Sequence, residues 1–264
     1  MPPRPLRAGL RNRLRDAALL AIAAVAAAGT AQAQVTLKPD GRWRYLLTAG
    51  ANATSGNSDT TQFNATGEAA RVTDHDKLTF RGQCNYGKVN GVTATQRYLA
   101  GTQYNRDISP RSFYFGSGDL LRDRPSNIAH RYSIAGGVGR HMVRSDNLNF
   151  DISVGLGYTQ DSYVTPVSLF GQPRDEYGRT ELVLAEETSH QLTGTTKLRQ
   201  RFTIYPNLTD QGSYRALLDA GISVAMTNTL SLSAGVNYRY DSDPGAGLRR
   251  ADASFVTGVS LRFD

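Results

Sequence analysis

The feature that most constrains this chain is a strict alternation of apolar residues with small or polar ones, sustained over long runs. From Leu148 to Tyr158, every even position holds Leu, Phe, Ile, Val or Tyr, whereas the odd positions hold Asn, Asp, Ser or Gly. The same period recurs from Tyr214 to Met226 and from Leu230 to Tyr240. Such alternation gives an extended strand one apolar and one polar face. The runs exceed the roughly five or six residues that are common for strands in soluble proteins.

Twelve such runs cover the chain, and each predicts a strand. They lie at residues 42–54, 60–72, 77–88, 94–107, 112–122, 128–143, 148–164, 179–191, 196–205, 213–226, 230–241 and 251–263. The fifth run has no clear phase, because Phe113, Tyr114 and Phe115 put aromatic residues on both faces. The longest uncharged apolar run, Ala17 to Gly29, is shorter than the roughly 20 residues of a spanning helix, so any membrane crossing is expected from strands.

The connections between the runs alternate in length. The even-numbered connections are compact, at residues 73–76, 108–111, 144–147, 192–195 and 227–229. The odd-numbered ones are longer and richer in Gly and Pro, notably Thr165 to Gly178 and Ser242 to Arg250. A meander with short turns at one end and long loops at the other is typical of outer-membrane barrels, whose short turns lie in the periplasm.

Closure of the sheet also solves an energetic problem. A soluble protein with these apolar faces would expose a large apolar patch, whereas a closed barrel satisfies every backbone group within hydrocarbon and has no free edge. We therefore predict an all-β fold, a closed antiparallel transmembrane up-and-down β-barrel of about 12 strands. A soluble exported β-sandwich is the alternative fold.

The first 33 residues have the layout of a cleavable secretory signal peptide. A basic start with five Arg is followed by an apolar stretch from Ala17 to Ala28 and by the small-residue cleavage box Ala31-Gln32-Ala33. We expect residues 34–264 to form the barrel domain, exported to a bacterial outer membrane. Without the leader the net charge falls from +7 to about +3, so the basic isoelectric point gives no argument for nucleic acid as a partner.

Aromatic residues gather where the two membrane interfaces are expected. They are Trp43, Tyr45, Phe80, Tyr104, Phe113 and Phe150 near the short-turn end, and Phe63, Tyr86, Tyr98, Tyr158, Tyr163, Tyr238 and Tyr240 near the other end. The last run, from Phe255 to Phe263, resembles the C-terminal signal that barrels present to the barrel-assembly machinery, although Asp264 follows the aromatic residue. The expected partners are this machinery and outer-membrane lipid.

One stretch of the chain resembles a known family. The segment from Ala49 to Thr60, with the turn Gly56-Asn57-Ser58, looks like the start of a family of salt-induced outer-membrane proteins of unknown function. The likeness extends from Trp43 to Phe263, through the Gly-rich run Ala135 to Gly139 and the pair Glu186-Glu187. The resemblance implies an outer-membrane location and a role in salt or osmotic stress, and it supplies no activity or catalytic residues.

If the apolar set faces lipid, the opposite face presents nine basic and five acidic residues to the lumen. These lumen-lining candidates are Arg44, Glu68, Arg81, Arg97, Arg131, Asp151, Glu181, Glu187, Lys197, Arg199, Arg201, Arg215, Asp219 and Arg239. The set predicts either a narrow wet channel with a mild preference for a small anionic solute or an interior closed by salt bridges. The basic stripe 197–201 either attracts an anion or balances Glu181 and Glu187. The segment from Val164 to Gly178 either plugs the barrel or extends outward.

No constellation for catalysis, metal or cofactor binding is evident. The four His are His75, His130, His141 and His190, expected at the surface or in the interfacial belts. Ser133 is three residues from His130, which puts the two on opposite faces of a strand. The run Gly136-Gly137-Val138-Gly139 lies within a strand with no helix after it, so it predicts bending or close packing rather than a phosphate loop. We predict a passive channel or envelope component, with a closed structural barrel or a lipid-modifying enzyme as alternatives.

Overall fold

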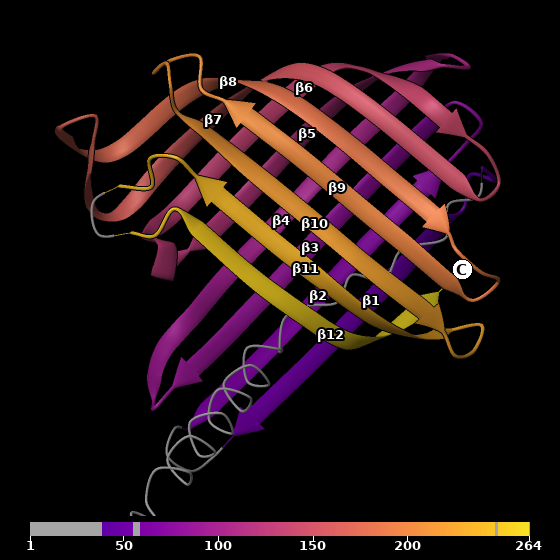
Figure 1. Ribbon diagram of the computed structural model, residues 1–264, viewed down its shortest axis with the longest axis horizontal. Coiled ribbons are helices and arrows are strands. Elements are labelled where there is room, and N and C mark those ends of the chain that lie inside the picture. The colour runs from indigo at the N-terminus through magenta and orange to yellow at the C-terminus, as the bar shows by residue number, and fades with distance from the viewer. Residues whose placement is uncertain (1–38, 55–58, 246–247, 264) are drawn as a thin grey trace, which may run out of the picture.

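The computed structural model describes residues 39–54, 59–245 and 248–263, so the predicted leader at residues 1–33 lies outside the described residues. The chain forms twelve antiparallel strands that pair in sequence order, and β1 pairs with β12 to close a barrel (Figure 1). The strands are β1 (Trp43–Thr54), β2 (Thr60–Val72), β3 (Asp76–Val89), β4 (Val92–Ser109), β5 (Ser112–Asp123), β6 (Ile128–Arg144), β7 (Leu148–Leu169), β8 (Gln172–Gln191), β9 (Thr196–Pro206), β10 (Tyr214–Ala225), β11 (Leu230–Asp241) and β12 (Ala251–Phe263). The predicted fold class is confirmed.

The even-numbered connections are short, as predicted, and all of them lie at one end of the barrel. They occupy residues 73–75, 110–111, 145–147, 192–195 and 226–229. We call this end the short-turn end and the opposite one the long-loop end. Within the described ranges the only helix is the single 3-10 turn η1 (Arg124–Ser126), and no helix there is long and apolar enough to span a bilayer.

The largest error of the sequence-based prediction is the hairpin that joins β7 to β8. The predicted loop from Thr165 to Gly178 is instead a continuation of both strands, which meet at a tight turn formed by Phe170 and Gly171. Both turn residues have positive φ, 52° and 78°, as a two-residue hairpin turn requires. The strands were hidden in the sequence because the register shifts between Ser162 and Val167 and because prolines interrupt the alternation.

The outer face of the barrel is apolar, and the inner face is polar. Along β6 and β7 the outward side chains are strongly exposed, as in Ile134 (67 %), Val138 (54 %) and Leu156 (58 %). Two of the aromatic residues expected in the interfacial belts lie inside instead. Phe113 is only 3 % exposed, and Tyr163 packs on an interior apolar cluster, because each follows the inward phase of its strand, Phe113 with Phe115 and Tyr163 with Asp161.

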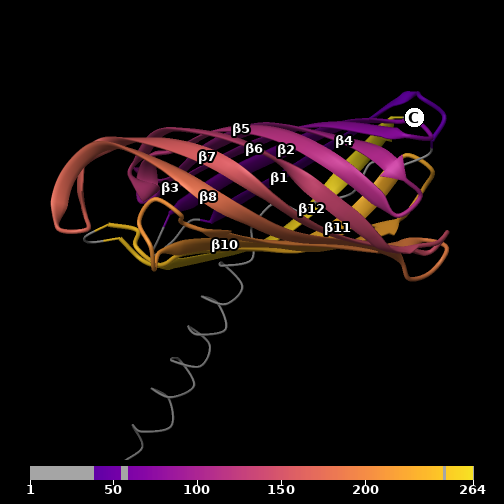
Figure 2. The same cartoon turned by 90° about the horizontal axis from the view of Figure 1, so that it is seen from above.

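The barrel is flattened, and glycines in one wall allow this. Figures 1 and 2 show a broad but thin barrel in which β5 faces β10 across the interior. The rings of Phe113 and Phe115 on β5 lie against Gly137, Gly139 and Gly155 of the two following strands. A Cβ atom at Gly139 would come within 2.2 Å of the Phe113 ring. The close-packing role predicted for the Gly-rich run is therefore confirmed.

Candidate functional site

The interior of the barrel holds a cavity of about 590 Å³ that extends from the short-turn half to the β7–β8 hairpin. Eleven of the fourteen predicted lumen residues line it, namely Glu68, Arg81, Arg97, Arg131, Glu181, Glu187, Arg199, Arg201, Arg215, Asp219 and Arg239. The other three, Arg44, Asp151 and Lys197, lie nearer the short-turn end, outside this lining. Of these, Arg44 is 5 % exposed and donates hydrogen bonds to Asp40 at 2.5 and 3.0 Å.

The charges around the cavity are nearly balanced. Among the described residues the basic lining residues are Lys77, Arg81, Arg97, Arg131, Arg179, Arg199, Arg201, Arg215, Arg239, Arg249 and Arg250, and the acidic ones are Glu68, Asp119, Asp123, Asp161, Glu181, Glu187, Asp219, Asp241, Asp243 and Asp252. The predicted lumen set has four more basic than acidic residues, whereas the cavity lining has only one more. Sequence reasoning missed Asp119 and Asp123 because the phase of β5 is obscured by its aromatic residues, and it placed Arg179 at the first residue of the predicted strand 179–191 without assigning it to the lumen.

A lower charged layer crosses the lumen near the short-turn end. It consists of Glu68 on β2, Lys77 on β3, Glu187 on β8, and Arg199 and Arg201 on β9. Arg199 lies 3.4 Å from Glu68 and 3.2 Å from Glu187, while Lys77 lies 3.6 Å from Glu187. The basic stripe on β9 thus balances Glu187, as one of its two predicted roles required.

Two of these contacts, Arg199 with Glu68 and Lys77 with Glu187, bridge opposite walls, whereas Arg199 and Glu187 lie on the neighbouring strands β9 and β8. Four strands separate β9 from β2 along the shorter way around the barrel, and four separate β3 from β8. A third crossing joins Arg201 on β9 to Gln103 on β4 through a hydrogen bond of 2.5 Å. Because the barrel is flattened, pairs of long side chains are enough to span it, so the lower charged layer obstructs the lumen.

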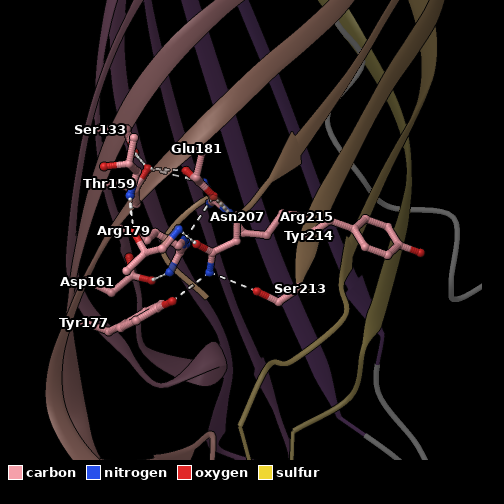
Figure 3. Close-up of polar contacts among 12 residues, drawn as sticks. Ser133, Thr159, Asp161, Tyr177, Arg179, Glu181, Asn207, Ser213, Tyr214 and Arg215 are labelled. Atoms are coloured by element: carbon pink, nitrogen blue, oxygen red, sulfur yellow. Dashed lines mark hydrogen bonds and ion pairs between the residues drawn. The ribbon is translucent and has the colours of Figure 1, made fainter. Parts of the chain in front are cut away.

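An upper charged layer lies closer to the long-loop end and is built mainly within one wall (Figure 3). Asp161 on β7 accepts two hydrogen bonds from Arg131 on β6 and one of 3.0 Å from Arg179 on β8. Glu181 on β8 accepts hydrogen bonds of 3.0 Å from Arg179 and of 2.6 and 2.9 Å from Arg215. Both carboxylates are 1 % exposed. This wall is therefore braced by desolvated, multiply hydrogen-bonded ion pairs.

Two further arginines belong to the upper charged layer and approach one carboxylate from opposite walls. Arg97 on β4 donates a hydrogen bond of 2.7 Å to Asp123, the last residue of β5. Arg239 on β11 reaches the same carboxylate from the other side of the barrel, at 3.9 Å. Five strands separate β5 from β11 in either direction, so this contact crosses the full lumen.

The β7–β8 hairpin forms a roof over the long-loop end of the cavity. Val167, Leu169 and Tyr177 are buried together, and Leu169 and Phe170 line the cavity from above. A Cβ atom at Gly245 in the β11–β12 loop would lie 3.3 Å from Val167, so the hairpin touches the loop of a distant strand pair. Figure 2 shows the hairpin curling over the barrel mouth. Of the two predicted courses for Val164 to Gly178, the structure takes the inward one.

A polar contact anchors the roof to the neighbouring β9–β10 loop. The Tyr177 hydroxyl donates a hydrogen bond of 2.5 Å to Asp210 and accepts one of 2.7 Å from the Asn207 side chain. Asn207 also donates to the Ser213 hydroxyl at 2.9 Å (Figure 3). The loop 207–213 and the hairpin are therefore held as one unit above the upper charged layer.

His141 lies inside the barrel at the short-turn end, contrary to the surface or interfacial position expected for it. Its Nδ1 lies 2.7 Å from Asp151 and its Nε2 lies 3.2 Å from Asp107. Because carboxylates occupy both ring nitrogens, neither is free to activate a nucleophile. Ser133 faces the lumen, where it hydrogen-bonds with Thr159, whereas His130 is exposed on the outside, as the strand spacing predicted.

Comparisons with solved structures find folds of the same general kind at low identity. The NanC porin is 11 % identical, with 83 % of this chain and 98 % of that chain covered and a TM-score of 0.48. The KdgM porin is 10 % identical, with 84 % and 100 % covered and a TM-score of 0.43. The translocator domain of the autotransporter NalP from Neisseria meningitidis is 13 % identical, with 96 % of both chains covered and a TM-score of 0.41.

One family model matches most of this chain. No curated protein matches this sequence. The model of one family, described as a protein of unknown function, DUF481, matches residues 47–263, which include every strand from the middle of β1 to the end of β12. The chain therefore belongs to the DUF481 family of proteins of unknown function.

Proposed function

We propose that this protein is an outer-membrane barrel that gives small solutes a narrow passive pathway, closed at rest by the lower charged layer. The observation that carries the proposal is the set of contacts that cross the lumen. Arg199 contacts Glu68, and Lys77 contacts Glu187, from strands on opposite walls. An obstruction made of side chains can open at that level without movement of the backbone, which suits a low-conductance pathway better than a wide pore.

The apolar outer face supports the membrane location. Side chains such as Ile134 and Leu156 are more than half exposed, and a closed sheet leaves no unpaired edge to meet lipid. We propose that residues 1–33 direct export and that the strand ending at Phe263 is recognised by the barrel-assembly machinery. Replacement of Phe263 by Ala is then expected to lower the amount of barrel in the outer membrane without changing synthesis of the chain.

Planar-bilayer recording of the refolded barrel tests the pathway. The wild type is expected to give small or rare steps. The double variant Glu68→Ala/Arg199→Ala removes a whole cross-lumen pair and leaves no single charge unpaired. It should give steady steps of several-fold higher conductance, because the obstruction is lost. Heat-modifiable migration on a gel shows that each barrel has folded.

A matched control removes a similar pair that does not cross the lumen. Arg81 on β3 and Asp119 on β5 form an ion pair of 2.6 Å along a single wall and also line the cavity. Arg81→Ala/Asp119→Ala is expected to change conductance far less than the cross-lumen variant. Equal conductance of the two variants would show that the lower charged layer is not the obstruction.

A closed structural barrel is the second candidate, favoured by the roof and the near-balanced charge. It predicts that Glu68→Ala/Arg199→Ala remains non-conducting although folded. The resemblance noted in the sequence alone suggests a role under salt or osmotic stress, which a deletion strain grown at graded salt concentrations would test. A lipid-modifying enzyme receives no support from His141, whose ring nitrogens both face carboxylates.

A further inference from the structure

We infer that the upper half of the cavity is a binding site for a small monoanion with an apolar body, such as an aromatic carboxylate. The site lies between the upper charged layer and the roof. The inference extends the proposed function by naming the class of solute. Binding can be measured whether or not the barrel conducts, so either proposal can be refuted while the other holds.

The anion would be held beside Asp123, where two guanidinium groups share one carboxylate. Arg97 and Arg239 share the single carboxylate of Asp123, and within the described residues no carboxylate comes closer to Arg239 than 3.9 Å. The Arg239 side chain is 30 % exposed and lines the cavity, so its donors are accessible from inside the barrel. A guanidinium presents a planar fork of donors that matches a carboxylate, which makes these arginines suitable partners for one.

Unpartnered donors next to the cavity are a second, independent observation. Nε of Arg97 and Nη2 of Arg179 are buried, and neither has a hydrogen-bond partner. Buried donors without a partner are rare in folded proteins and mark places where a ligand or water is missing. The side chain of Arg179 is 6 % exposed and lies in the upper charged layer. Both orphaned donors thus belong to the charged layer that would bind the anion.

The roof supplies the apolar part of the site. Tyr163, Leu169 and Phe170 line the same cavity as Arg239, and the Phe170 ring lies 6.0 Å from that of Tyr177. Ligand sites typically enclose about 300–1,000 Å³ and combine apolar walls with a few placed polar groups. The cavity volume of about 590 Å³ falls in this range.

The balance of charge favours a single negative charge on the ligand. The lining has only one more basic than acidic residue among the described ones, and Asp219 and Asp252 line the cavity near Arg239. A second negative charge would meet these carboxylates at close range and would be repelled. The site therefore suits a carboxylate better than a phosphate dianion.

Isothermal titration of the refolded barrel with three probes tests the site. Benzoate carries both the charge and the ring, acetate carries the charge alone, and benzyl alcohol carries the ring alone. Benzoate is expected to bind saturably, at least tenfold more tightly than acetate or benzyl alcohol. If benzoate and acetate bind saturably with equal affinity, the apolar part of the site is wrong. If benzoate gives no saturable heat, the whole proposal is wrong.

Two variants and a control separate the parts of the site. Arg239→Gln should weaken benzoate binding at least tenfold. Phe170→Asn keeps a residue that tolerates the positive φ of the turn, and it should weaken benzoate but not acetate binding. Arg111→Gln changes an exposed arginine in the turn 110–111 at the other end of the barrel and should have no effect. Equal losses in Arg239→Gln and Arg111→Gln, or an unchanged affinity in Phe170→Asn, would contradict the assignment.

Discussion

The two charged layers use the same residue types but are built differently. In the lower layer two ion pairs cross the lumen, Arg199–Glu68 and Lys77–Glu187, their N···O distances are 3.4 and 3.6 Å, and their side chains are 17–27 % exposed. In the upper layer the contacts of Arg179 and Arg215 with Asp161 and Glu181 stay within one wall, measure 2.6–3.0 Å and involve carboxylates that are at most 2 % exposed. The lower layer bridges the barrel, whereas the contacts around Asp161 and Glu181 in the upper layer stiffen one wall, and only Arg239 of that layer reaches across to Asp123.

This difference implies different energies for breaking each layer. Removal of one partner from a buried ion pair leaves an uncompensated charge and typically costs about 3–5 kcal/mol. A partly hydrated pair contributes about 0–1 kcal/mol, because water replaces the lost partner. If the barrel conducts as proposed, the lower charged layer is the part that a solute or an applied voltage would open, while the upper charged layer would keep the geometry of the cavity.

Gly137→Ala should have the largest effect, because it disturbs the wall on which both layers depend. A Cβ atom there would lie 2.2 Å from the Val154 carbonyl oxygen and 2.5 Å from the Gly155 Cα atom, so backbone would have to move. We expect loss of about 3 kcal/mol or more, seen as failure to form the heat-modifiable species. Gly116→Ala on the paired strand meets nothing within 4 Å and serves as the control. Normal folding of Gly137→Ala would refute the account of the flattened wall.

Asp161→Asn and Glu68→Gln compare the two layers directly. The first leaves Arg131 and Arg179 without their shared carboxylate in a dry wall, and about 3 kcal/mol should be lost in urea unfolding of the folded barrel. The second removes a partner of Arg199 that is 17 % exposed, and the loss should be about 1 kcal/mol or less. If the two variants lose the same stability, the contrast between the layers is wrong.

The sequence predicts the strands of this barrel well and the pairing of its charges poorly. Period-two alternation located all twelve strands, and of the two roles left open for the stripe from Lys197 to Arg201, Arg199 and Arg201 fulfil the balancing of Glu187 on the adjacent strand. Glu181 pairs instead with Arg179 and Arg215. Neighbouring strands are readable because their register follows from the turn between them.

Two physical causes account for what could not be predicted. Partners across the lumen, such as Glu68 and Arg199, are 131 residues apart, and only the shear and flattening of the closed barrel bring them together. Bulges change the phase of a strand, as at the start of β6, where Ile128 and Arg131 both line the cavity although they are three residues apart. Asp161 could nevertheless have been predicted as a lumen residue, because it lies on the same uninterrupted alternating run as Asp151 and has the same inward phase.

Tyr177→Phe tests how firmly the roof is held. The change removes the hydroxyl that donates to Asp210 and accepts from Asn207, while the ring stays in the apolar cluster. A hydrogen bond to a charged group contributes about 1.5–3 kcal/mol, and Asp210 can recover part of this from water, so a loss of about 1 kcal/mol is expected. Limited proteolysis should cut the loop 207–213 faster than in the wild type. Tyr214→Phe, whose ring is 43 % exposed, is the control.

The smallest effect is expected at the short-turn end, just before β1. The Arg44 guanidinium, helped by the Arg42 backbone N–H, lowers the pKa of Asp40 from 3.8 to about 2. A carboxyl with a lowered pKa in the folded state stabilises that state above the unfolded value, and the benefit disappears as the pH falls through about 2.

Asp40→Asn should therefore lower the urea midpoint slightly at pH 7, and the difference should shrink as the pH falls through about 2, where Asp40 becomes protonated in the wild type as well. Asp74→Asn, in the exposed turn 73–75, controls for the loss of a surface charge. A midpoint shift as large as that of Asp161→Asn would mean that exposed pairs at this end brace the barrel as strongly as the dry upper wall. The contrast between the layers would then reflect their position in the barrel and not their hydration.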